Sequence, residues 1–174
     1  GLILNIVETL AGMDGVGAIF FGEDMGFKTA TMLSPAAMRE LIFPWHRRIV
    51  AAAHARGKPI LLHSCGNLAS IMNDILATGW DAKHSYEDVV LPNTEMKALY
   101  GSRIAVLGGI DMDLLGRGSE AAVRARVREV IRACAPGGGF ALGSGNTVAN
   151  YVPLANYLAM LDECWRRGRY STKC

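Results

Sequence analysis

Short runs of apolar residues alternate along this chain with longer segments in which apolar residues recur at helical spacing. A short apolar run bounded by Gly or Pro is typical of a buried strand, whereas apolar positions three and four residues apart are typical of an amphipathic helix. The pattern predicts strands over 18–22, 59–63, 80–84, 103–107 and 140–142. It predicts helices over 2–12, 34–56, 68–77, 92–100, 119–134 and 153–167. The expected order is one helix followed by repeated βα units.

Local signals mark several of these helix ends. Ser34 and Ser119 stand where a side chain can accept a hydrogen bond from the first helical turn. Pro44 is expected to kink the long helix over 34–56, because proline lacks an N–H and crowds the preceding turn. Asn67 is expected to cap the helix that follows it.

The alternation of strands and helices implies an α/β fold with a parallel sheet. The 174 residues suffice for a sizeable core, and we expect a single domain over 1–174. Two architectures fit this pattern. One is a five-stranded doubly wound sheet that is complete in itself. The other is the later part of an eight-stranded βα barrel, which typically needs about 250 residues.

The stretch His63-Ser64-Cys65 is the most informative in the chain, because it stands at the carboxyl end of the strand over 59–63. Both α/β architectures bind ligands at that end of their strands. Residues two apart on a strand point to the same side, so His63 and Cys65 would present an imidazole and a thiolate together. Such a pair can share a Zn²⁺ ion. The alternative is a buried His and a buried Cys that only pack.

Other polar residues follow the remaining predicted strands. Glu23 and Asp24 form a carboxylate pair that could act in the site or simply cap its own loop. His84 could bind substrate or act as an acid or base, or could be a hydrogen-bonded core histidine. Asp111 could approach a ligand, or cap the turn after its strand. The Gly-rich loop with Ser144 and Asn146 carries N–H groups of the kind that bind anions.

Composition excludes several classes of protein. The chain is 51% hydrophobic and 20% charged, as in a globular protein rather than a disordered one. The net charge is +2 without a basic stripe interleaved with aromatic residues, so nucleic acid is not an expected partner. Arg124, Arg126 and Arg128 lie on one predicted helix and are expected to form a solvated face.

The four cysteines show no disulfide-framework spacing, and neither a signal peptide nor a long apolar run is recognisable. Reduced thiols in the cytoplasm, without a membrane, are therefore the expectation. The chain starts at Gly1 and enters at once a stretch that reads as the middle of a helix, so we expect a fragment of a longer protein.

Four motifs occur in an order that resembles a known family. They are His63-Ser64-Cys65-Gly66-Asn67, Gly79-Trp80-Asp81-Ala82, Leu107-Gly108-Gly109-Ile110-Asp111 and Asn156-Tyr157-Leu158-Ala159-Met160-Leu161. Together they resemble the carboxyl-terminal part of the uroporphyrinogen decarboxylase superfamily, which also contains cobalamin-dependent methyltransferases. The resemblance covers essentially the whole chain and implies the later half of a βα barrel, with about five βα units.

The methyltransferase branch of that superfamily implies a zinc site. There, a His-x-Cys-Gly pattern supplies two ligands and a later Cys in a Gly-Cys-Gly turn supplies the third. His63 and Cys65 match the first pattern, but Ser144 stands where the third ligand would be. Glu23, Asp24 and His84 are the replacements to consider, and we favour an acidic one.

The resemblance implies zinc-dependent methyl transfer between a corrinoid and a thiol as the activity of the intact protein. The alternative within the family is metal-independent decarboxylation of a porphyrinogen or a related acidic substrate. The last strand turn, however, lacks the His that decarboxylases usually carry. Their arginine-rich motif and catalytic Asp belong to the half that precedes this chain. A third alternative is a non-catalytic binding or assembly domain.

The expected partners follow from these alternatives. They are a small-molecule substrate and, for methyl transfer, a corrinoid protein. Part of a barrel also leaves unpaired sheet edges, so we expect the fragment to self-associate.

Overall fold

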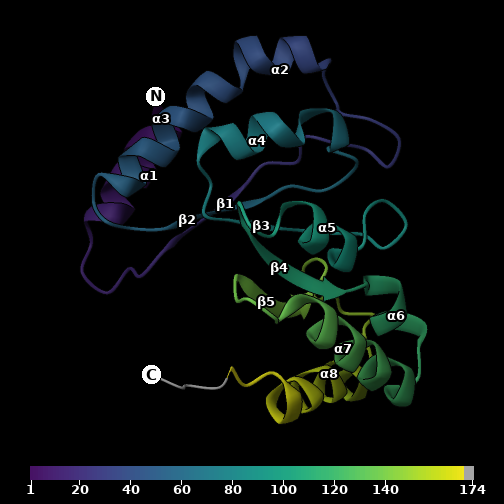
Figure 1. Cartoon of the computed structure of the whole chain (residues 1–174). Coiled ribbons are helices and arrows are strands. Elements are labelled where there is room, and N and C mark those ends of the chain that lie inside the picture. Colours follow the sequence, from purple (N-terminus) through teal and green to yellow (C-terminus); the bar gives the residue numbers. More distant parts are fainter. Residues whose placement is uncertain (171–174) are drawn as a thin grey trace. The chain divides into compact units, whose positions relative to one another are not determined.

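The computed structural model describes residues 1–170, and Figure 1 shows helices alternating with strands along the chain. The residues form two compact units, an amino-terminal unit over Gly1–Lys83 and a carboxyl-terminal unit from His84 onward. The α/β class is confirmed, with parallel strand pairing inside each unit. The expectation of a single domain over 1–174 stays a prediction.

The amino-terminal unit pairs its first two strands in parallel. Its elements are α1 (Leu2–Gly12), β1 (Ile19–Gly22), α2 (Pro35–Leu41), α3 (Phe43–His54), β2 (Ile60–His63), the 3-10 helix η1 (Ala69–Ile71) and α4 (Met72–Thr78); β3 (Ala82–His84) begins in it. Ile19 lies opposite Ile60, and Gly22 lies opposite His63. Because the two strands end level, the residues that follow β1 lie beside those that follow β2.

Strand β2 places its side chains alternately on two faces. Ile60 and Leu62 are fully buried, whereas Leu61 and His63 are partly exposed. His63 therefore projects from the face opposite to these two core residues, where a ligand can reach it.

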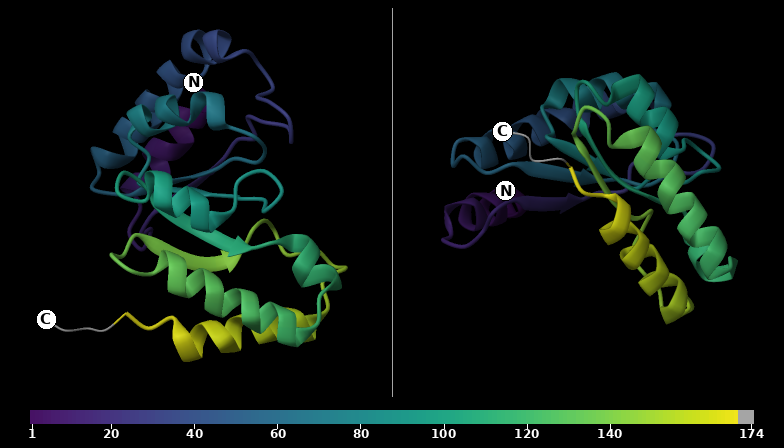
Figure 2. Two further views of the ribbon diagram at one scale, coloured as in Figure 1. Left: turned by 45° about the vertical axis from the view of Figure 1, so that its right-hand side comes forward. Right: turned by 60° about the horizontal axis from the view of Figure 1, so that its bottom comes forward.

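The carboxyl-terminal unit pairs β4 with β5 in parallel. Its elements are α5 (Asn93–Tyr100), β4 (Ala105–Ile110), α6 (Met112–Arg117), α7 (Glu120–Cys134), β5 (Phe140–Ser144) and α8 (Leu154–Arg167). Ile110 lies opposite Ser144, and the N–H of Gly145 donates to the carbonyl of Ile110 over 2.7 Å. The loops after β4 and β5 are thus held together. Figure 2 shows α7 and α8 side by side.

The long helix expected over 34–56 is two helices. α2 ends at Leu41 and α3 begins at Phe43, so the chain breaks just before Pro44 rather than kinking there. Pro44 fits the first turn of α3, where its missing N–H has no helical partner to lose. The caps expected at Ser34 and Ser119 are confirmed, because each hydroxyl accepts a hydrogen bond from the N–H three residues later.

A short helix, α6, was not expected from the pattern. Asp111 starts it by accepting a hydrogen bond from the N–H of Asp113 over 2.7 Å. Its six residues are too few to show a helical repeat. Strand β5 also continues beyond residue 142 to Ser144, because its pairing with β4 does not depend on apolar side chains.

The solvated arginine face predicted on the helix over 119–134 is wrong. Arg124 pairs with Asp162, and Arg126 pairs with Asp88 and Glu129. Glu163 on α8 is almost buried and lies near three guanidinium groups, those of Arg124, Arg128 and Arg167. The arginines therefore join α7 to α8 and to the loop after β3. Periodicity did not show this, because the partners lie far away in the sequence.

Low pH should weaken the contact between α7 and α8, because it protonates Glu163. The hydrogen bond from Arg128 is the main cause that lowers the pKa of Glu163 below its usual value of 4.5. A lowered folded-state pKa contributes stability that is present above the unfolded pKa and is lost as pH falls. Between about pH 5 and pH 2, where the folded protein takes up the proton at Glu163, we expect the Tm of the wild type to fall further than that of Glu163→Gln. Scanning calorimetry at constant ionic strength measures both Tm values. If the Tm of the wild type and that of Glu163→Gln decrease equally, the ion pairs of Glu163 contribute nothing to stability.

Two surface features concern the expected partners. Among the described residues, no helix is both long and apolar enough to cross a membrane. Helix α8 exposes Leu154, Leu158, Leu161 and Trp165 at spacings of four, three and four residues. This apolar stripe is compatible with self-association, which stays a prediction.

Candidate metal centre

Three potential ligands converge where β1 and β2 end. The Nε2 atom of His63 lies 3.5 Å from the Sγ atom of Cys65 and 3.8 Å from the Oδ1 atom of Asp24. One ligand atom from each residue lies within 4.8 Å of the others. The strand register causes this convergence, because Gly22 lies opposite His63 and Asp24 follows two residues later.

The loops that carry these ligands are tied together by backbone contacts. The N–H of Cys65 donates to the Asp24 carboxylate over 2.9 Å. The N–H of Met25 donates to the buried hydroxyl of Ser64 over 3.1 Å. The N–H of Asn67 donates to the carbonyl of Phe27 over 2.6 Å. Main-chain N–H groups thus hold the two ligand loops together in one framework, through two side-chain acceptors and one carbonyl.

Gly66 makes this framework possible. Its φ is +84°, and a Cβ atom at this position would lie 2.3 Å from the carbonyl carbon of Gly26. No other residue type combines this backbone angle with so close an approach. The Cys-Gly-Asn part of the motif thus has a structural role beside the chemical role of Cys65.

The electrostatics of the centre favour the metal-binding forms of its side chains. The hydrogen bond from the Cys65 N–H is the main cause that lowers the pKa of Asp24. Burial lowers the pKa of His63, because it penalises the charged imidazolium. A carboxylate and a neutral imidazole are therefore both available near neutral pH.

Sequence reasoning missed Lys83 at this centre. Its side chain is almost fully buried, and its Nζ atom donates to the carbonyl of Ser64 over 3.1 Å. Burial lowers the pKa of Lys83 to about 7, and the neighbouring Cys65 and Asp24 oppose that shift. A lysine inside a predicted strand was the available signal, since lysine is seldom buried without a reason.

Glu23 turns away from the three ligands. Its Oε2 atom lies 2.5 Å from the Nε2 atom of His46 on α3. His46 is buried and packs against the rings of Phe21, Phe43 and Trp80. Of the two neighbouring carboxylates, Asp24 is the one that lies beside His63 and Cys65. Sequence reasoning missed the contact with His46, because the two residues belong to different elements.

Comparison with known proteins places this geometry in a family. A family model described as uroporphyrinogen decarboxylase (URO-D) matches residues 4–166. The chain belongs to the uroporphyrinogen decarboxylase family. A comparison with curated proteins finds no match. Among solved structures, a methyltransferase from Methanosarcina mazei is similar with a TM-score of 0.70 and 20% sequence identity. The similarity covers 89% of this chain and 43% of that chain, so this chain spans less than half of its length.

The family match confirms the resemblance expected from the four motifs. The structural similarity shows a shared fold, and it confirms a partial βα barrel rather than a doubly wound sheet. The order of the four motifs along the chain therefore predicted both the family and the barrel architecture correctly.

The remaining predicted site residues of this family member lie in the carboxyl-terminal unit. The Nε2 atom of His84 lies 3.0 Å from the carbonyl oxygen of Ser144. Asp111 caps α6, and the side chain of Asn146 accepts a hydrogen bond from the N–H of Thr147 over 2.7 Å. Asp111 and Asn146 also line one cavity. Their predicted roles in catalysis and cofactor binding, and those of His84 and Ser144, stay predictions.

Proposed function

We propose that this chain is part of an enzyme that transfers a methyl group between a corrinoid and a thiol at a zinc ion. The ion would be held by Asp24, His63 and Cys65. The observation that carries the proposal is the convergence of these three side chains at two adjacent strand ends. The similar structure is named a methyltransferase, which supports the same reaction class.

The three residues fit zinc by their chemistry. Imidazole nitrogen, thiolate sulfur and carboxylate oxygen are the ligand types of protein zinc sites. Three protein ligands leave one position for a substrate, which is the arrangement of catalytic rather than structural sites. A bound Zn²⁺ ion lowers the pKa of a substrate thiol, so that the nucleophilic thiolate exists near neutral pH.

The chain's own residues contribute charge and orientation. Asp24 would supply the acidic third ligand, since Ser144 stands in the sequence where the family resemblance implies a Cys. The hydrogen bond from the Cys65 N–H holds one carboxylate oxygen in place. Asp24 and a Cys65 thiolate together bring two negative charges, which balance a divalent ion. A substrate thiolate would add a third, and the buried Lys83 beside Ser64 is placed to offset it.

Decarboxylation of an acidic porphyrinogen is less well supported. A cavity in the carboxyl-terminal unit is lined by the carboxylates of Glu87 and Asp111, and none of its described lining residues is basic. Such a lining repels a substrate that carries several carboxylates, so the cations that bind such a substrate would have to come from outside this cavity.

The test uses purified protein, including any natural sequence beyond these residues. Zinc is measured by mass spectrometry, and methylation of a small thiol is followed with methylcobalamin as donor. We expect about one zinc per chain and a methylated thiol that disappears after chelation. Release of carbon dioxide from a porphyrinogen by zinc-free protein would establish the decarboxylase instead. Absence of both activities would favour a binding or assembly domain.

A further inference from the structure

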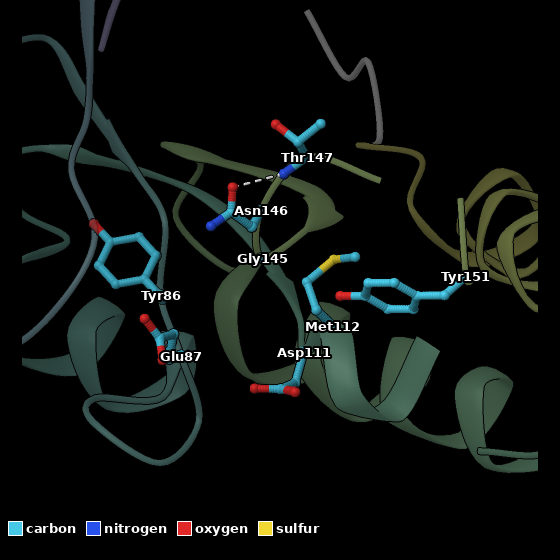
Figure 3. Close-up of a pocket in the computed structure, with 8 residues that line it drawn as sticks. All are labelled: Tyr86, Glu87, Asp111, Met112, Gly145, Asn146, Thr147 and Tyr151. Atoms are coloured by element: carbon cyan, nitrogen blue, oxygen red, sulfur yellow. Dashed lines mark hydrogen bonds between the residues drawn. The ribbon is translucent and has the colours of Figure 1, made fainter. Parts of the chain in front are cut away.

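The carboxyl-terminal unit contains a cavity that the zinc proposal does not use. Its volume is about 310 Å³, and residues from the loops that follow β3, β4 and β5 line it. Figure 3 shows these residues, with the ring of Tyr86 on one side and that of Tyr151 on the other. A cavity of this volume lies at the lower end of the range for small-molecule sites, so its ligand is small.

The lining is acidic. Glu87 and Asp111 contribute carboxylates, whereas Lys and Arg are absent from the described lining residues. The Asp111 carboxylate accepts hydrogen bonds from the N–H groups of Asp88 and Asp113, which orient it without cancelling its charge. Among the ion pairs of the described residues, neither Glu87 nor Asp111 has a basic partner.

The guanidinium group of Arg126, which pairs with the loop after β3, is already engaged. Arg126 forms two hydrogen bonds with the carboxylate of Asp88 and one with that of Glu129. Burial is the main cause that raises the pKa of Asp88, and the charge of Asp111 raises it further. Arg126 therefore serves Asp88 and Glu129, and the cavity carboxylates of Glu87 and Asp111 are left for an incoming cation.

Beside Gly145, Asn146 and Thr147, the cavity is lined by two aromatic rings and a thioether. Tyr86 is buried, and burial raises the pKa of its phenol, so the ring stays neutral. Tyr151 presents a second ring, and Met112 contributes a thioether. Aromatic faces beside carboxylates are the groups that recognise alkylated ammonium ions, through the ring quadrupole and through charge.

We propose that this cavity binds a small organic cation with an alkylated ammonium or similar onium group. A metal ion fits less well. In the described part of the chain, the one group of three or more metal-ligating side chains close enough to share an ion is Asp24, His63 and Cys65. Glu87 and Asp111 are not part of it. The proposal does not rest on zinc or on methyl transfer, because all its residues belong to the carboxyl-terminal unit.

The test is calorimetric titration of the full chain with tetramethylammonium chloride at constant ionic strength. The neutral compound of matching shape is neopentyl alcohol, and inorganic phosphate serves as an anionic probe. We expect tetramethylammonium to bind at least about 10-fold more tightly than either, because charge and ring quadrupole both contribute. Equal binding of neopentyl alcohol, tighter binding of phosphate, or no heat from tetramethylammonium up to about 10 mM would overturn the proposal.

Variants locate the binding within the cavity. Asp111→Asn removes a charge but keeps an N-cap side chain for α6, and Glu87→Gln removes the other charge. The double variant should bind tetramethylammonium about 10-fold more weakly, and Tyr151→Ala about 3-fold more weakly. Glu95→Gln, on an exposed position of α5 outside the cavity, should bind like the wild type. Unchanged affinity in both Glu87→Gln and the double variant would overturn the proposal, and circular dichroism checks that each variant is folded. Zinc content measured on the same samples tests the methyltransferase proposal separately.

Discussion

Replacing Cys65 by Ser is expected to lower zinc affinity by more than about 100-fold. Loss of an outer-shell partner in a zinc site costs about 10- to 100-fold, so loss of a ligand should cost more. Cys65 supplies the sulfur of the group, and its Sγ atom lies 3.5 Å from the imidazole nitrogen of His63. Competition with a chromogenic chelator at fixed pH measures the affinity.

Two neighbouring carboxylates provide a matched control for this result. Asp24→Asn should weaken zinc binding, because the carboxylate beside His63 is lost. Glu23→Gln should leave zinc affinity unchanged, because Glu23 contacts His46 instead. A Cys65→Ser variant that binds zinc like the wild type would remove the basis of the proposed function. An effect of Glu23→Gln equal to that of Asp24→Asn would mean that the wrong carboxylate has been assigned.

Replacing Gly66 by Ala is expected to cost about 3 kcal/mol or more of unfolding free energy. An alanine with positive φ costs about 1 to 2 kcal/mol, and the added methyl group would overlap the backbone of Gly26. The loops of Cys65 and Asp24 would have to separate to relieve this overlap. Zinc affinity should therefore fall together with stability. Urea unfolding followed by circular dichroism measures the change.

Gly57 offers the control for that substitution. Its φ is +65°, but a Cβ atom there would meet nothing within 4 Å. Gly57→Ala should therefore cost only the conformational penalty, about 1 to 2 kcal/mol, and leave zinc binding unchanged. If both substitutions cost the same, the close contact between Gly66 and Gly26 is not tight in solution.

Local sequence patterns predicted much of the fold. The apolar run before His63 and the helical repeat after Ser119 were recognised because strands and helices impose periods that a sequence shows directly. Helix α6 escaped, because six residues fit no repeat and its start depends on Asp111. The break before Pro44 was expected as a kink, because proline predicts a disturbance but not whether the chain resumes in line.

The sequence alone determined that His63 and Cys65 lie together, since both belong to one strand end and the distance between them depends on local geometry. It also determined the family, through four motifs in order. Only the tertiary structure decided that Asp24, and not Glu23, joins them, and that the buried Lys83 donates to the carbonyl of Ser64. The position of Asp24 depends on the register of β1 against β2. The contact of Lys83 depends on the packing of segments that are distant in the sequence. No local sequence pattern encodes a register or a long-range contact.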